Sequence, residues 1–244
     1  MPEADLTAFR STLTSGAADL GLEIASSHLD AYSAHYTLLL THQAEAGLTS
    51  LTNPAEVAIK HFLDSLTCLL IRDIGPCETV ADIGSGGGFP GLVLAVARPQ
   101  ARYTLIESNR KRAAFLEAAV DAIHLDNTTI LTERAETAGR HPDHRDAYNL
   151  VLSRAVAPLP IALEYALPLA RVGGHCLAMK GPQAPDEIEK SDRALSELRA
   201  RIARTKDLSL PHSMGRRTLL LIEKTAPTPD RYPRRPGLPA KRPL

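Results

Sequence analysis

The sequence comprises 244 residues, of which 44% are hydrophobic, and its 28 acidic and 28 basic residues cancel in formal charge. A chain of this length and apolar share can bury a sizeable core, which excludes a disordered protein and favours one domain with appended elements. No apolar run approaches the roughly 18 residues that a membrane span needs, and the acidic start is unlike a signal peptide, so we expect a cytoplasmic protein without a membrane partner.

Residues 1–75 are predicted to form an N-terminal helical extension. Leu6, Phe9 and Leu13 recur at the spacing of one helix face. Further along, Asn53-Pro54-Ala55-Glu56 is typical of a helix start, with an N-cap side chain, proline at the first position and an acid that completes a capping box.

Residues 76–224 alternate between short apolar runs and helical patterns. Strands are expected near 78–83, 102–107, 128–132, 147–153, 172–179, 204–209 and 217–223. Helices are expected near 90–98, 109–123, 158–171 and 185–202. This alternation predicts an α/β fold, Rossmann-like, with a mostly parallel doubly wound sheet, and the short link between the last two strands suggests an antiparallel edge hairpin.

The segment 80–91 carries the strongest signal, because an apolar strand leads into five glycines within eight positions. Glycine can adopt positive φ and lets a ligand approach the backbone, and Pro90 suits the first position of the following helix. A strand, a glycine turn and a helix start in this order predict a nucleoside-cofactor loop.

Two acidic residues bear on which cofactor binds. Gly86, Gly88 and Gly91 satisfy a G-x-G-x-x-G spacing, so NAD remains possible. Asp82 favours S-adenosylmethionine, which has no phosphate, because an acid about 4 Å from a pyrophosphate costs roughly 4 kcal/mol at an effective dielectric near 20. Glu107, at the end of the next strand, could accept the ribose hydroxyls of either cofactor.

Several motifs along residues 47–244 resemble one family. They are Lys60-His61-Phe62-Leu63-Asp64-Ser65, Phe89-Pro90-Gly91, Asn109-Arg110-Lys111-Arg112, Ser153-Arg154-Ala155, Met179-Lys180-Gly181 and the tail Tyr232-Pro233-Arg234-Arg235-Pro236-Gly237. In this order they resemble the bacterial RsmG family, also called glucose-inhibited division protein B. The resemblance implies a class I methyltransferase that transfers a methyl group from S-adenosylmethionine to N7 of one guanine in 16S rRNA of the small ribosomal subunit.

The resemblance also implies cofactor contacts at Gly84, Phe89, Ala135, Glu136 and Arg154. Phe89 is expected to supply an apolar wall, and Ala135 and Glu136 to meet the adenine edge. Gly84, with Gly86, gives close backbone approach, and Asp82 and Glu107 complete the predicted cofactor set.

Guanine N7 carries a lone pair and no proton, so its methylation needs positioning rather than a general base. We predict that Arg154 and Lys180 position the RNA and the target base. No metal site is expected, because Cys68, Cys77 and Cys176 are far apart and form no CxxC pair.

Positive charge collects at the C-terminus, where residues 224–244 hold six basic residues and one acid. Residues 225–244 are predicted to form a basic, proline-rich tail that is extended and mobile on its own. RNA phosphates are expected to contact Arg110, Lys111, Arg216, Arg217, Arg234 and Arg235. No protein partner is expected. Two alternatives remain: a small-molecule S-adenosylmethionine-dependent methyltransferase, and a nucleotide- or NAD-binding protein without methyl transfer.

Overall fold

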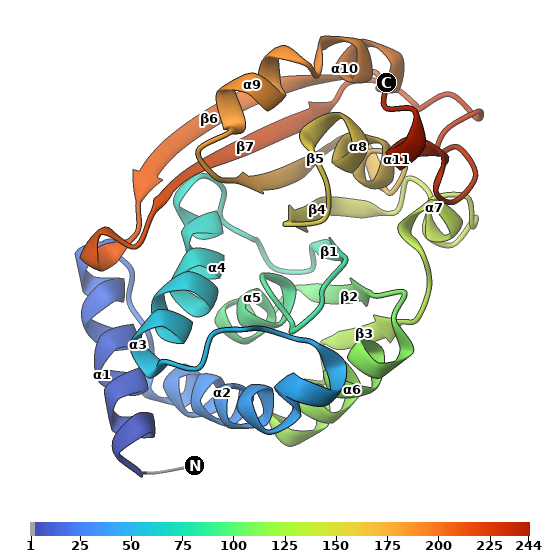
Figure 1. Ribbon diagram of the computed structural model, residues 1–244. Helices are drawn as coiled ribbons and strands as arrows, with labels where there is room; N and C mark the ends of the chain where they lie inside the picture. The colour runs from blue at the N-terminus through green and yellow to red at the C-terminus, as the bar shows by residue number, and fades with distance from the viewer. Residues whose placement is uncertain (1–2) are drawn as a thin grey trace.

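The structure is a computed structural model that describes residues 3–244, and a seven-stranded sheet forms its centre (Figure 1). The strand order is β3-β2-β1-β4-β5-β7-β6. The strands are β1 (Thr79–Ile83), β2 (Arg102–Ile106), β3 (Thr128–Leu131), β4 (Tyr148–Arg154), β5 (Ala170–Lys180), β6 (Ala200–Ser209) and β7 (Arg216–Lys224). The first five are parallel, and β7 and β6 add an antiparallel edge. The predicted fold class is therefore confirmed.

Helices cover both faces of the sheet (Figure 1). On one face lie α5 (Gly91–Ala97) and α6 (Arg110–Ala122). The opposite face packs against α8 (Leu159–Ala166) and α10 (Asp192–Leu198), with α7 (Ala135–Ala138) beside them and α9 (Ala184–Glu189) preceding α10. Among residues 3–244, none of the helices combines the length and the apolar character that crossing a bilayer requires.

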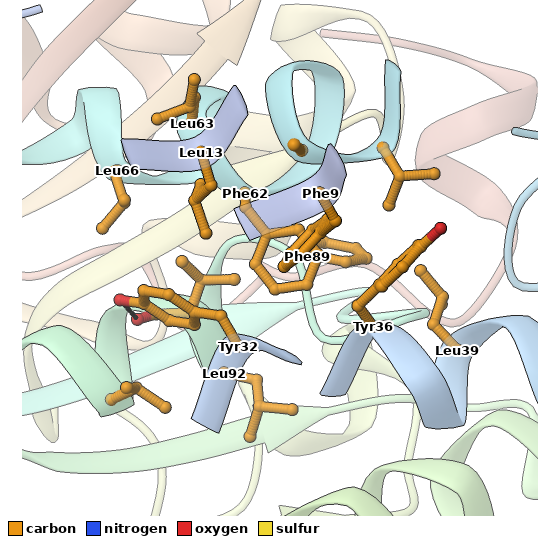
Figure 2. Close-up of a cluster of buried hydrophobic side chains, with 14 of the residues drawn as sticks. Phe9, Leu13, Tyr32, Tyr36, Leu39, Phe62, Leu63, Leu66, Phe89 and Leu92 are labelled. Atoms are coloured by element: carbon orange, nitrogen blue, oxygen red, sulfur yellow. Dashed lines mark hydrogen bonds between the residues drawn. The ribbon is translucent and has the colours of Figure 1, made fainter. Parts of the chain in front are cut away.

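The N-terminal helices share a core with the first face of the sheet. They are α1 (Glu3–Asp19), α2 (Ser26–Ala46), α3 (Pro54–Val57), the π-helix η1 (Ala58–Leu63), α4 (Asp64–Leu66) and the 3₁₀ helix η2 (Thr67–Leu70). Phe9 stacks on Tyr36 at 4.3 Å between ring centroids, and Phe62 meets Phe89 edge-on at 5.2 Å. Figure 2 shows these rings gathered around Phe89, which belongs to the glycine loop. The loop is thus packed against residues from the first third of the chain.

The start of α3 agrees in part with the predicted capping box. Asn53 Oδ1 accepts hydrogen bonds from the N–H groups of Ala55 and Glu56 at 3.0 and 3.2 Å, as an N-cap should. Glu56 pairs with Lys60 one turn further along the chain. The helix that was expected to start at Pro90 begins one residue later, at Gly91.

Two helices end earlier than predicted. The helix expected over 158–171 stops at Ala166. Leu167 still has helical dihedral angles, but Pro168 has no N–H group with which to continue the hydrogen-bond ladder. The helix expected over 185–202 is divided into α9 and α10, and Arg199 ends α10 in the left-handed region with φ of 58°. Strand β6 starts immediately after this residue, so the edge strand is longer than its sequence pattern indicated.

The C-terminal tail is packed rather than extended, so the prediction of a free mobile tail is wrong. Residues 228–237 lie against α7 and α8, and the short helix α11 (Leu238–Lys241) follows beside α8 (Figure 1). The Arg145 guanidinium donates to the carbonyl oxygens of Thr228 and Tyr232 at 2.7 and 2.8 Å. Sequence composition identified the charge of this segment but not its partners.

Candidate functional site

The glycine loop joins β1 to α5 at the edge where the parallel strands end. The Gly84 N–H donates to the Ile106 carbonyl at 2.8 Å, which ties the loop to β2. Gly84 and Gly86 adopt φ of 66° and 53°, a region that favours glycine. A side chain at Gly86 would meet nothing closer than the Gly84 carbonyl oxygen at 3.8 Å, so the space beside this residue is open to a ligand.

Asp82 is buried, with 1% of its surface exposed, and it holds the loop to the start of α5. Its Oδ2 accepts from the Gly91 N–H at 3.0 Å, and its Oδ1 has no hydrogen-bond partner among residues 3–244. Burial raises the pKa of Asp82 to about 7, although the bonds from Gly91 and Ser85 oppose this shift. With a pKa near 7 the Asp82 carboxyl is only partly ionised at neutral pH, so the charge repulsion expected of it from sequence is weaker than that of a fully ionised carboxylate.

Glu107 clamps the loop from the end of β2. Its Oε2 accepts from the Gly86 N–H at 3.0 Å, and its Oε1 accepts from the Asn109 N–H at 2.8 Å. Each carboxylate oxygen can accept a further hydrogen bond. The carboxylate is therefore fixed beside the loop while it can still receive ribose hydroxyls.

A first cavity of about 140 Å³ opens beside Gly84. Its walls are Gly84, Ile106, Ser108, Glu133, Arg134, Ala135, Glu136, Val156 and Tyr165. The structure thus brings Gly84, Ala135 and Glu136 together, as predicted for the cofactor set. The enclosed volume is below the roughly 300 Å³ of typical ligand cavities, so it suits one end of a nucleoside cofactor.

A second cavity of about 450 Å³ adjoins the first, and Val156 lines both. Its walls are Asp64, Arg154, Ala155, Val156, Ala157, Pro158, Met179, Lys180, Gly181, Gln183, Glu187 and Arg217. The two residues predicted to position the base, Arg154 and Lys180, therefore lie in one cavity. This cavity is the candidate acceptor site.

Arg154, at the end of β4, is held by the π-helix η1 and by α4. Its Nη2 donates to the Lys60 carbonyl at 2.9 Å and lies 3.0 Å from His61 Nδ1, while its Nε lies 3.6 Å from Asp64 Oδ2. π-helical segments are common at functional sites. Asp64 is 2% exposed and also accepts from Arg217 Nε at 2.9 Å, so one buried carboxylate orients two guanidinium groups.

His61 is neutral and lies between Arg154 and Thr49, with one ring nitrogen toward each. Burial and the neighbouring Arg154 charge lower its pKa to about 3. Since the Arg154 guanidinium can only donate, His61 Nδ1 is the acceptor, and the proton lies on Nε2, 2.8 Å from Thr49 Oγ1. The motif of residues 60–65, which carried part of the family resemblance, thus fixes Arg154.

Phe89 lines neither cavity, and the same holds for Asp82, Gly86 and Glu107, so their cofactor contacts stay predictions. Its ring is 8% exposed and lies between His61 and His35, with centroid distances of 4.6 and 5.0 Å. The Arg154 guanidinium lies 5.7 Å from its centroid. Phe89 therefore anchors the loop into the N-terminal helices.

Lys180, at the end of β5, has two partners in the second cavity. Its ammonium group donates to the Ala157 carbonyl at 2.7 Å and lies 2.9 Å from Glu187 Oε2. Sequence reasoning missed Glu187, Val156 and Asp64 as members of the site. Of these three, only Asp64 could have been suspected from sequence, because it belongs to the motif of residues 60–65.

The six residues predicted to contact RNA differ in their surroundings. Arg110, Lys111, Arg216 and Arg235 are exposed. Arg217 pairs with Asp64 at the second cavity, and Arg234 pairs with the buried carboxylate of Glu164. Because its guanidinium is already engaged, we do not carry Arg234 forward as a phosphate contact.

Comparisons with known proteins bear on this site. A family model described as rRNA small subunit methyltransferase G matches residues 28–217. Ribosomal RNA small subunit methyltransferase G of Pelotomaculum thermopropionicum is 42% identical over 233 residues, covering 96% of this chain and 98% of the relative. The protein of the same name from Symbiobacterium thermophilum is 43% identical and covers 98% of this chain and 100% of the relative.

Solved structures support the fold. A Pyrococcus horikoshii protein described as a transferase, PH0793, has a TM-score of 0.54 at 18% identity and covers 72% of this chain and 66% of its own. At this identity the likeness concerns the architecture alone.

Proposed function

Because the chain belongs to the rRNA small subunit methyltransferase G family, we propose that it transfers a methyl group from S-adenosylmethionine to N7 of a guanine in the 16S rRNA of the small ribosomal subunit. The observation that supports this best is the pair of cavities that share Val156 at the carboxyl ends of the parallel strands. One suits a cofactor and the other carries the cationic residues that an RNA acceptor requires.

Glu107 and Gly86 do not line the first cavity, but each is next in sequence or in the loop to residues that do, and their chemistry fits S-adenosylmethionine. Glu107 is fixed beside the loop where ribose hydroxyls would lie, and the open space at Gly86 admits a ligand close to the backbone. Asp82 is buried and lines neither cavity, so it acts on a cofactor only through the loop that it holds. When bound, S-adenosylmethionine supplies an electrophilic methyl group on a sulfonium.

The second cavity would hold the guanine. N7 has its own lone pair, so no protein group has to remove a proton, and the task of the residues is to orient the base and exclude water. Arg154 is suited to this because Lys60, His61 and Asp64 hold its guanidinium in one orientation. An arginine that bound both O6 and N7 would block the reaction, so we place Arg154 and Lys180 on phosphate, ribose, O6 or the cofactor carboxylate.

The exposed basic residues support an RNA acceptor over a small metabolite. Arg110 and Lys111 begin α6, and Arg216 begins β7 beside the second cavity residue Arg217. We propose that these groups, with Arg235, contact phosphates around the target base. A methyltransferase of small molecules would have no use for them.

Single-turnover methyl transfer tests the proposal. The full-length protein is incubated with purified small subunits, naked 16S rRNA and a metabolite panel, and the product is identified by nuclease digestion and mass spectrometry. We expect 7-methylguanosine only in the RNA, and a roughly 100-fold slower transfer in Arg154→Ala and Lys180→Ala, the scale that misplacement of a reacting group produces.

Arg102→Ala, at the exposed start of β2 and thus at the opposite edge of the sheet, is the matched control for loss of one basic side chain and should keep the wild-type rate. Methylation of a metabolite, or of an exocyclic amine in the RNA, would contradict the proposal. Unchanged rates in both cavity variants would remove Arg154 and Lys180 from the site.

A further inference from the structure

The packed tail touches the cofactor cavity through α7. The Gly237 N–H donates to Glu136 Oε1 at 3.0 Å, and Glu136, which is 5% exposed, lines the first cavity. No hydrogen bond from residues 3–244 reaches Glu136 Oε2. One carboxylate oxygen is therefore held by the tail, and the other is free for a ligand.

A buried ion pair fixes the tail at this place. Glu164 on α8 is fully buried, and it accepts from the Arg234 N–H at 2.8 Å, from Nε at 2.8 and 3.1 Å, and from Nη2 at 2.5 Å. A buried carboxylate without its partner is costly, so Glu164 strongly favours the docked tail. Its neighbour Tyr165 lines the first cavity.

The tail also contacts the far end of α7. Arg145 donates to the Gly139 carbonyl at 3.0 Å and, with the same Nη1, to the Tyr232 carbonyl at 2.8 Å. A Cβ at Gly139 would lie 3.2 Å from the Pro233 side chain, which shows how closely the tail packs there. Residues 228–237 thus join α7, which carries Ala135 and Glu136, to α8, which carries Tyr165.

We propose that residues 228–237 are a positioning element for cofactor binding: Arg234 fixes the segment on α8, and the Gly237 N–H then orients Glu136 in the wall of the first cavity. This inference rests on the proposed function, because it takes the first cavity as the S-adenosylmethionine site. Arg234 acts through Gly237 and Glu136 and touches no ligand itself. Its role is therefore in cofactor affinity rather than in RNA binding.

The test uses full-length variants and the dissociation constant of S-adenosylhomocysteine from titration calorimetry. Because Arg234→Met leaves a buried charge, the main variant is the neutral double change Glu164→Gln with Arg234→Gln. We expect it to bind S-adenosylhomocysteine about tenfold more weakly, which corresponds to about 1.4 kcal/mol. The KM for S-adenosylmethionine should rise equally, with kcat at saturating cofactor within twofold of the wild type.

Gly237→Ala is the second variant. A Cβ at Gly237 would meet nothing within 4 Å, but its φ of 79° is strained for alanine, so the change disturbs only the backbone that presents the N–H. We expect about threefold weaker binding, within the range that such strain allows. Arg201→Met is the matched control, because it breaks an ion pair outside residues 228–237, to Glu223 on β7, and should leave affinity unchanged.

The results distinguish failure of the positioning role from failure of the proposed function. Variants that are fully folded by circular dichroism and bind S-adenosylhomocysteine with wild-type affinity would overturn the positioning role. So would weaker RNA binding with unchanged cofactor affinity, which would assign the tail to RNA. A wild-type protein that binds no S-adenosylhomocysteine would instead overturn the proposed function.

Discussion

The glycine loop and α7, which both contribute residues to the first cavity, are supported in different ways. The glycine loop is held by aromatic packing from the N-terminal helices, with Phe89 between His35 and His61, and by one hydrogen bond of 2.8 Å from His35 Nε2 to the Gly87 carbonyl. The α7 side is held by ion pairs and backbone hydrogen bonds from residues 228–237. One support is mainly apolar, and the other is polar.

The difference teaches what each support can control. Burial of rings contributes a large, weakly directional stabilisation. Hydrogen bonds and ion pairs contribute less net stability but fix geometry, because a buried polar group tolerates few arrangements. We therefore expect the N-terminal support to dominate folding and the C-terminal support to dominate the precision of the cavity wall.

Phe89→Ala should have the largest effect on stability. It removes a ring that is 8% exposed and contacts three other rings, and such truncations cost about 3–5 kcal/mol. Denaturant unfolding at neutral pH measures the change. Val172→Ala is the matched control, because that side chain is 44% exposed and should cost little. A loss below about 1 kcal/mol for Phe89→Ala would contradict the comparison.

Arg234→Met should destabilise the protein by about 3 kcal/mol, because it leaves the Glu164 carboxylate buried without its partner. The double variant with two glutamines should recover most of this loss, since no unpaired charge remains. Unfolding midpoints of the two proteins make the comparison. Equal losses in both would mean that packing, not charge pairing, holds the tail.

The pH dependence of stability sharpens the comparison on the N-terminal side. Burial lowers the pKa of His35 from 6.5 to about 4. Between these two pH values the unfolded chain binds a proton at this histidine and the folded protein does not. The contribution of neutral His35 to the free energy of unfolding is therefore complete above pH 6.5. It is lost as the pH falls toward 4, and about 2 kcal/mol of it is lost at pH 5. His35→Gln should flatten this part of the stability curve.

Asp82 acts with the opposite sign, because its raised pKa makes the folded protein bind a proton more tightly between about pH 4 and 7. Wild type and His35→Gln share the Asp82 contribution, so it cancels when the stability curve of one protein is subtracted from that of the other. Exposed His141 is the matched control. An unchanged slope in His35→Gln would mean that this histidine is not held neutral by burial.

The sequence predicted the strands and the site edge well, because both depend on local patterns. Short apolar runs and the glycine turn specify β1 and the loop, and parallel strands then bring Gly84, Glu136 and Arg154 to the same edge of the sheet. Helix ends were less predictable. Arg199 ends α10 with a positive φ, which is uncommon for arginine and which no local sequence pattern indicates.

The sequence patterns left out contacts between residues that are distant along the chain. Arg234 looked like a free basic residue, but its partner Glu164 lies 70 residues earlier in the chain. Phe89 was expected to face the cofactor, and the structure adds that His35 and Phe62 of the N-terminal helices pack against its ring. Only tertiary structure decides whether such a side chain faces a ligand or the core.

The direction of β7 has a consequence for the acceptor cavity. Thr218 at the start of β7 pairs with Lys180 at the end of β5, because the two strands are antiparallel. The turn that enters β7, at residues 211–215, consequently lies at the functional edge, near α1, where Pro211 would be 3.4 Å from a Cβ at Gly16 (Figure 1). A parallel last strand would have delivered this turn to the opposite end of the sheet. Reversing one strand thus places Arg217, near the start of β7, in the wall of the second cavity, together with residues at the ends of β4 and β5.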